Sequence, residues 1–112
     1  MAEIVYTFSI SPGKEDVDRQ IMDEIGGARR DEYVAALKDA GITRQAIWHQ
    51  QQPDGGTLAI VYILATDPEA PRRLASSDAE ISQWFAQQIR EGYGRYFSGP
   101  PLPVELINDF RV

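Results

Sequence analysis

The 112-residue sequence contains no cysteine. Disulfides, thiolate zinc sites, iron–sulfur clusters and cysteine nucleophiles are therefore excluded, and the fold must be stabilised by packing alone. Histidine is almost as scarce, because His49 is the only one in the chain. It is the only side chain whose ordinary pKa lies near neutral pH, and a metal site built on two histidines is excluded with it.

The sequence also contains few basic residues and no long apolar run. Eleven Lys and Arg residues stand against seventeen acids, for a net charge of −6, whereas a nucleic-acid partner requires a basic surface. No apolar run approaches the roughly 20 residues that cross a bilayer. The N-terminus lacks the basic region and cleavage site of a signal peptide. The sequence therefore predicts a cytoplasmic protein with neither a nucleic-acid nor a membrane partner.

Familiar catalytic and cofactor motifs are missing as well. The chain has no G-x-S-x-G element and no glycine-rich phosphate loop. Several acids near the first predicted helix follow no metal-binding spacing, and a solvent-facing helix surface explains them. These acids are Asp16, Asp18, Asp23, Glu24, Asp31 and Glu32. We accordingly predict no metal and no cofactor.

The clearest positive signal is a β-hairpin. Apolar runs at Ile42–Gln52 and Thr57–Ala65 flank the sequence Pro53-Asp54-Gly55-Gly56, and an Asp-Gly turn between strand-like runs is typical of a hairpin. The second run is apolar on both alternating sides, which predicts a central strand covered on both faces. Helices of the same chain can cover one face, so the other is left for a partner subunit, a ligand or both.

Further elements follow from periodicity and from turn residues. Alternation predicts a strand at Ala2–Ile10, and apolar spacing predicts a helix over roughly residues 15–40, bent at Gly26-Gly27 and ended by Gly41. The remaining predicted elements are a short helix from Asp67 to Leu74, a helix that starts after Ser77-Asp78 and ends near Gly92, and a proline-rich C-terminal extension, residues 98–112, with a candidate last strand at Val104–Phe110.

The order strand, helix, strand, strand, helix, strand is the ferredoxin-like split βαβ pattern. We therefore predict one α+β domain over residues 1–112, with a four-stranded antiparallel sheet and both main helices on one face. The other face would be bare in a monomer. Packing it against the same face of a second copy would cover it, so a homodimer is expected.

Two local patterns carry a resemblance to known proteins: the strand and turn at Trp48–Gly55, and the capped helix at Ser77–Phe85. With the overall element order, they make the chain resemble the dimeric α/β-barrel superfamily, and in particular short uncharacterised bacterial members. Members include cofactor-independent monooxygenases acting on aromatic substrates, haem-binding enzymes, isomerases and proteins of no known activity. The resemblance implies a fold, a dimer and a cavity without naming a reaction. No residue matches a haem axial-ligand motif.

His49 is the candidate catalytic residue, as a general base or a haem ligand. The alternative is that it is simply a polar residue on a glutamine-rich strand. Strand alternation points His49 and its neighbour Trp48 to opposite sheet faces, so only one of them can face a cavity. The candidate ligand-binding residues are the aromatic side chains Trp48, Tyr62, Trp84 and Tyr6. They either line a pocket for a flat apolar molecule or belong to the core.

Three hypotheses for the function remain open at this point. The first is a homodimer that binds a small apolar or aromatic molecule. The second is a cofactor-independent monooxygenase or isomerase, in which His49 or a tyrosine moves a proton. The third is a purely structural or interaction dimer. The sequence leaves open the ligand, whether any reaction occurs, which sheet face His49 occupies, and whether a dimer associates further.

Overall fold

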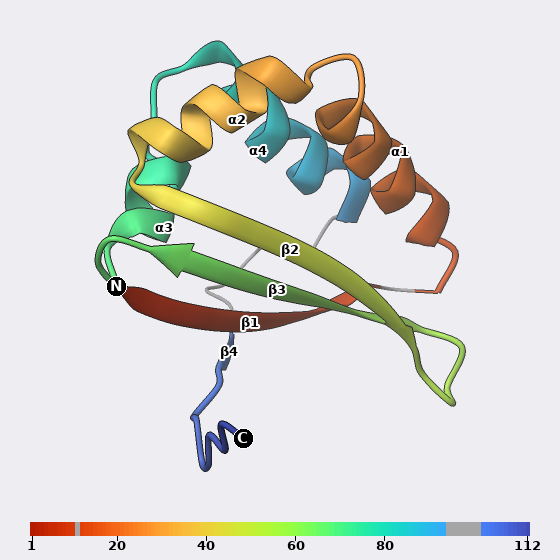
Figure 1. The fold of residues 1–112 in the computed structure, drawn as a ribbon. Coiled ribbons are helices and arrows are strands. Elements are labelled where there is room, and N and C mark those ends of the chain that lie inside the picture. Colours follow the sequence, from red (N-terminus) through yellow and green to blue (C-terminus); the bar gives the residue numbers. More distant parts are fainter. Residues whose placement is uncertain (11, 94–101) are drawn as a thin grey trace.

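The computed structural model describes residues 1–10, 12–93 and 102–112. This part of the chain forms a mixed α+β fold with a three-stranded antiparallel sheet and four helices (Figure 1). The strands are β1 (Ala2–Ile10), β2 (Ile42–Gln51) and β3 (Thr57–Ala65), and the helices are α1 (Glu15–Gly26), α2 (Arg30–Asp39), α3 (Ala70–Ala75) and α4 (Glu80–Tyr93).

Strand β3 lies in the centre of the sheet, antiparallel to β1 on one side and to β2 on the other. The predicted β2–β3 hairpin is confirmed. Its turn is closed by a 2.8 Å hydrogen bond from the Gln52 backbone N–H to the Gly56 carbonyl. Gly55 adopts a φ of +89°, a conformation that glycine tolerates best.

The predicted last strand at Val104–Phe110 is wrong. A two-residue strand β4 (Leu102–Pro103) pairs with β1 at its free edge, and residues 104–112 form no regular structure. Pro103, the last residue of β4, has no N–H to donate to a ladder. The extended four-stranded sheet is therefore not formed in the described part of the chain. The other residues of the proline-rich extension, 98–101, lie outside it.

The region predicted as one bent helix contains two helices, α1 and α2. A Cβ on Gly27 would lie 2.8 Å from the Asp23 carbonyl oxygen, so the chain passes there only because glycine has no side chain. The predicted end of α2 is confirmed, since Gly41 follows it with a φ of +85°. Helix α3 begins later than predicted, because the Asp67 carboxylate accepts the Glu69 backbone N–H at 2.8 Å and stabilises a preceding turn.

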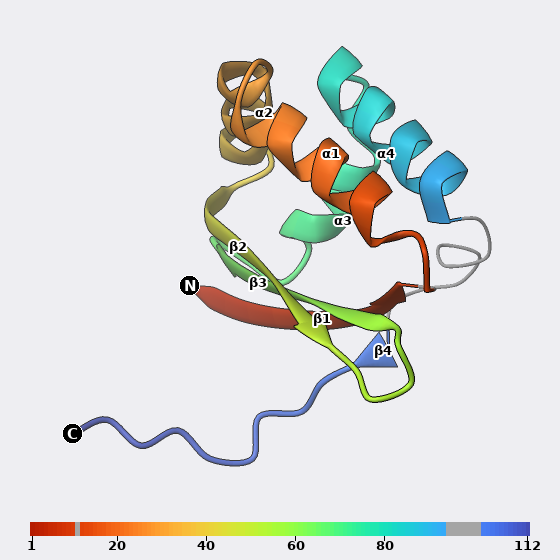
Figure 2. The ribbon, with the colours of Figure 1, turned by 90° about the vertical axis from the view of Figure 1, so that its right-hand side faces the viewer.

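All four described helices lie on one face of the sheet (Figures 1 and 2). Core side chains such as Ile10, Ile63 and Ala65 point from the sheet toward them and are almost fully buried. The alternate positions point away, and Trp48, on that outer face, is 50% exposed. In the described ranges, no helix combines the length and the apolar character that crossing a bilayer requires.

Candidate functional site

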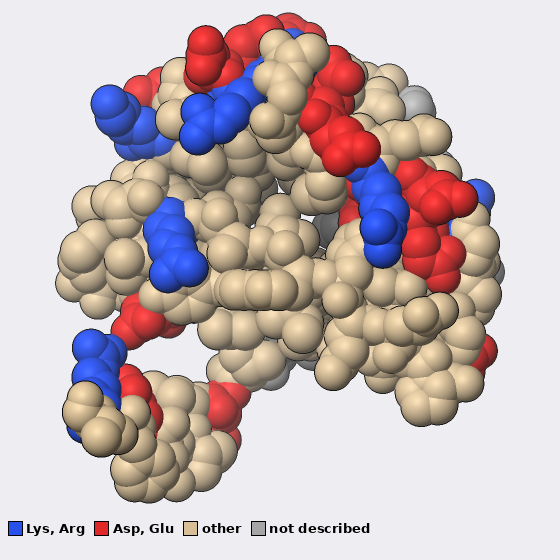
Figure 3. All heavy atoms as spheres, turned by 45° about the vertical axis from the view of Figure 1, so that its right-hand side comes forward, with Lys and Arg blue, Asp and Glu red and all other residues tan. Residues whose placement is uncertain are grey.

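A cavity of about 370 Å³ lies between the helix-covered face of the sheet and the helices. Its floor is formed by side chains of all three strands, among them Phe8, Ala59 and Ile47. Met22 of α1 and Phe85 of α4 contribute from the helical layer. Figure 3 shows the molecule hollowed between these two layers. The volume falls within the ~300–1,000 Å³ that small-molecule sites occupy.

The central strand explains why this space is open. At the middle of its inward face β3 carries Ala59 and then Val61, and their partners on β1 are Phe8 and Tyr6. Small side chains on the central strand between larger neighbours leave a depression in the floor, because the helices rest on the larger side chains. Packed interiors otherwise leave few voids larger than a water molecule. The cavity is thus a consequence of two small inward residues on β3.

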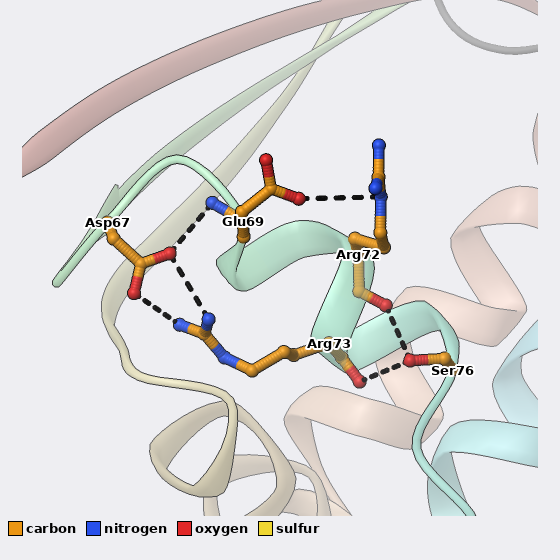
Figure 4. A network of polar contacts seen from close by, with 5 residues as sticks. All are labelled: Asp67, Glu69, Arg72, Arg73 and Ser76. Carbon is orange, nitrogen blue, oxygen red and sulfur yellow. Dashed lines mark hydrogen bonds and ion pairs between the residues drawn. The ribbon is translucent and has the colours of Figure 1, made fainter.

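Helix α3 forms one side of the cavity through Pro71 and Ala75. Arg73 fixes this short helix in place (Figure 4). Its guanidinium donates to the two carboxylate oxygens of Asp67 at 3.2 and 2.8 Å, and its Nε donates to the Ala40 carbonyl at 3.1 Å. The hydrogen bonds from Arg73 hold the pKa of Asp67 below its usual range. One side chain therefore ties α3 to the end of β3 and to the end of α2.

The most unusual polar group at the cavity is a contact between His49 and Asp18. The His49 side chain points to the helix-covered face, where its Nε2 donates a hydrogen bond to Asp18 Oδ2 on α1. Only 15% of the His49 side chain and 5% of the Asp18 side chain are exposed. Burial raises the pKa of Asp18, while the hydrogen bond and charge of His49 act in the opposite direction. The predicted candidate base thus has an acidic partner, which lines the cavity.

The expectation that Asp18 belongs to a solvent-facing helix surface is wrong. Asp18 precedes Ile21, Met22 and Ile25 by three, four and seven residues, a spacing that places all four on one helix face. That face packs on the sheet, and Asp18 is buried with it. An acid inside an apolar helical stripe was therefore the sequence signal for this residue. The notable feature was its position and not the number of acids nearby.

Two further polar side chains line the cavity, Gln45 of β2 and Tyr6 of β1. The Gln45 Oε1 accepts a 2.7 Å hydrogen bond from the hydroxyl of Tyr33, and burial raises the pKa of Tyr33 to about 12. This bond fixes the orientation of the Gln45 amide. Within the described residues, the Gln45 amide N–H groups and the Tyr6 hydroxyl have no hydrogen-bond partner. Both are therefore donors available to a molecule in the cavity.

The other aromatic candidates lie elsewhere, and their ligand-binding role stays a prediction. Trp48 and Tyr62 are on the outer sheet face, where the Tyr62 hydroxyl donates to Glu3 at 2.5 Å. Trp84 lies on α4, with the Arg29 guanidinium 4.8 Å from its ring centroid. Of the four aromatic candidates, Tyr6 is the one that lines the cavity.

Comparisons of the chain with protein-family models, with curated proteins and with solved structures found no match. The functional argument consequently rests on the cavity and on the side chains around it. Within the ranges that the structure describes, no three His, Asp or Glu side chains gather in a way that could hold a metal ion.

Proposed function

We propose that the protein is a homodimer of ferredoxin-like subunits and that each subunit binds a small, largely apolar or aromatic molecule between its sheet and its helices. The observation that carries the proposal is the cavity of about 370 Å³ with largely apolar walls. An unfilled apolar cavity is unfavourable because its lining atoms lack contact partners. A ligand that fills the space recovers those contacts.

The ferredoxin-like assignment is supported by the strand arrangement. Strands β1 and β2 run in the same direction with β3 between them, as the split βαβ pattern requires. The short strand β4 occupies the free edge of β1, where a fourth strand would complete the sheet. The resemblance to dimeric α/β barrels agrees with this arrangement and adds the expectation of a second subunit.

The cavity walls suggest the chemistry of the ligand. Aromatic rings contribute from below, through Tyr6 and Phe8, and from above, through Phe85. Such walls favour a flat ring, which stacks against them or meets their edges. The hydroxyl of Tyr6 and the amide of Gln45 would each recognise a polar atom on that ring. A one- or two-ring aromatic molecule with one hydrogen-bond acceptor fits these walls.

The outer sheet face supports the proposed dimer. Its centre carries Leu58, Ile60 and Leu64 of β3 beside the half-exposed Trp48, and Arg44 lies at its margin. An apolar centre with a polar rim is the usual composition of an interface. These residues are self-complementary when two copies pack face to face around a twofold axis.

The C-terminal tail, residues 104–112, adds to the same argument. Its side chains Leu106, Ile107 and Phe110 are between 75% and 83% exposed. The tail runs below the outer sheet face (Figures 2 and 3), and its Arg111 forms an ion pair with Glu3 of β1 at 3.5 Å. Apolar side chains held in this way next to an apolar sheet face are expected to pack against a second copy.

Two matched variants test ligand binding. Val61→Phe fills the cavity from its floor, whereas Ile60→Phe places the same ring on the opposite face of the same strand. We expect quinoline, a two-ring aromatic molecule with one hydrogen-bond acceptor, titrated by calorimetry, to bind the wild-type protein and Ile60→Phe but not Val61→Phe. Equal binding by all three proteins would refute the cavity as the site.

Native mass spectrometry of the protein as purified tests the dimer. We expect the mass of two chains, with additional mass where a ligand has been retained from the expression host. A stable monomer at micromolar concentration would contradict the dimer, and the exposed outer face would then need another explanation.

A further inference from the structure

Asp18 combines three properties that ordinary surface acids lack. Its side chain is 95% buried, since only 5% of it is exposed. It lines the cavity. Its Oδ2 accepts the hydrogen bond from His49, whereas its Oδ1 has no hydrogen-bond partner within the described residues. Oδ1 is not among the fully buried side-chain atoms that lack a partner, so it is the accessible carboxylate oxygen with which a molecule in the cavity would interact.

Hydrogen-bond donors lie elsewhere on the same walls. Gln45 precedes His49 by four residues on β2, which corresponds to about 13 Å along a strand. Tyr6 is on β1, on the far side of β3. A molecule of one or two rings in the cavity can therefore contact both the Asp18 carboxylate and one of these donors. A proton acceptor and hydrogen-bond donors around one cavity are the components of enolisation chemistry.

We propose that Asp18 accepts a proton from the bound molecule, that His49 is its positioning residue, and that the substrates are small, largely apolar ketones with an acidic C–H beside the carbonyl group. The inference rests on the proposed function, because it requires a ligand in the cavity. Asp18 is then the proton acceptor. His49, which the sequence analysis selected as the candidate base, acts only by positioning Asp18.

The chemical step is balanced without any further reactant. A lone pair of Asp18 Oδ1 forms an O–H bond as the C–H bond breaks. The electrons of the C–H bond form a carbon–carbon double bond, and the carbonyl π electrons move to the oxygen. The resulting enolate oxygen is bonded to the carbon next to the one that loses the proton, so it would accept a hydrogen bond from whichever of Tyr6 and Gln45 reaches toward Asp18. Asp18 then returns the proton to the same carbon or to a conjugated one, which gives an isomer of the same composition.

The charged surroundings of Asp18 determine how the step responds to pH. His49 on β2 and Arg19 on its own helix act on the charge of Asp18, and Arg72 of α3 lines the same cavity. Glu15, one turn earlier on α1, acts on His49. Burial keeps the pKa of Asp18 above its usual value, and a base is most effective when its pKa approaches the working pH.

The test uses 2-tetralone, a bicyclic aromatic ketone, in deuterium oxide. Nuclear magnetic resonance follows the replacement of its acidic C–H by deuterium. We expect the wild-type protein to accelerate this exchange and Asp18→Asn to lower the protein-dependent rate by about 100-fold or more, the range of general-base catalysis. Binding of 2-tetralone, measured by calorimetry, should survive Asp18→Asn and be lost in Val61→Phe.

His49→Gln tests the positioning role. Glutamine retains a donor but removes the interaction with His49 that favours the ionised carboxylate. The exchange rate should fall, and its loss at low pH should begin at a higher pH than in the wild-type protein. A purely structural histidine would leave this pH profile unmoved. If Asp18→Asn does not fold, the pH profiles of the exchange rate of the wild-type protein and of His49→Gln test whether Asp18 is the proton acceptor.

The outcomes separate this inference from the proposed function. If 2-tetralone binds and exchange is the same with and without the Asp18 carboxylate, the inference is overturned and ligand binding stands. If 2-tetralone and quinoline both fail to bind, the proposed function is overturned together with it.

Discussion

Replacing Ala59 by leucine tests whether the cavity is a real space in the folded protein. Ala59 is only 6% exposed and lies in the cavity floor between Phe8 and His49. Leucine adds three carbon atoms, each worth about 0.8 kcal/mol when buried. If they enter the cavity, the free energy of unfolding should rise by up to about 2 kcal/mol. If no space exists, overpacking should lower it by about 1–3 kcal/mol.

Ala65→Leu is the matched control, because Ala65 lies on the same face of β3 but is completely buried and away from the cavity. The same three carbons have no space there, so this variant should be less stable than the wild-type protein. Urea unfolding at one fixed protein concentration gives both values, since the stability of the proposed dimer would depend on concentration. Equal destabilisation by the two substitutions would refute the cavity.

The remaining predictions concern single buried groups and the outer face. Tyr33 should make the fold sensitive to alkali, because its pKa is raised from 10.0 to about 12 in the folded protein. The folded state therefore holds the phenolic proton more tightly than the unfolded state does. As the pH rises from 10 to 12, the free energy of unfolding should fall by up to roughly 2–3 kcal/mol. Urea unfolding against pH should show this fall in the wild-type protein and much less of it in Tyr33→Phe; parallel curves would contradict the raised pKa. The Ser82 hydroxyl is buried without a hydrogen-bond partner in the described structure, so Ser82→Ala should raise the melting temperature, with a gain of about 1 kcal/mol; a lower melting temperature would show that the hydroxyl has a partner. Ile60→Asp should leave a folded monomer by sedimentation analysis, because Ile60 is on the outer face, whereas Val61→Asp places a charge in the cavity floor and should reduce stability; a fully dimeric Ile60→Asp variant would exclude the outer face as the interface.

Much of the fold could be predicted because local signals and tertiary structure agree. The strand at Ala2–Ile10 and the hairpin around Gly55 are governed by alternation and by turn chemistry, which act within a few residues. The predictions that were wrong depended on finer contacts. The break between α1 and α2 depends on how closely Gly27 approaches a carbonyl of the preceding turn, and periodicity does not report that distance. The C-terminal residues have strand-like composition, but Pro103, which precedes them, lacks the N–H donor that pairing needs.

The candidate site was less predictable, for a different physical reason. His49 could be selected because it is chemically unique in the chain, but Asp18 is 31 residues away in sequence. The two meet only because α1 packs on the sheet and brings Asp18 against His49 of β2, and a single sequence does not show that contact. The sheet face that His49 occupies could not be predicted either. Strand alternation establishes that His49 and Trp48 point in opposite directions, but it does not say which of them faces the helices.

The doubly apolar strand β3 now has a separate explanation for each of its faces. Inward side chains such as Ile63 and Ala65 pack under the helices, and between them and the hairpin turn Ala59 and Val61 leave the cavity open. In the part of the chain that the structure describes, no helix covers the outward side chains of the same strand, and they form the proposed interface. Because adjacent residues of one strand serve the two roles, a substitution at Ile60 can alter assembly while one at Val61 alters binding. This separation makes the dimer and the ligand site independently testable in one protein.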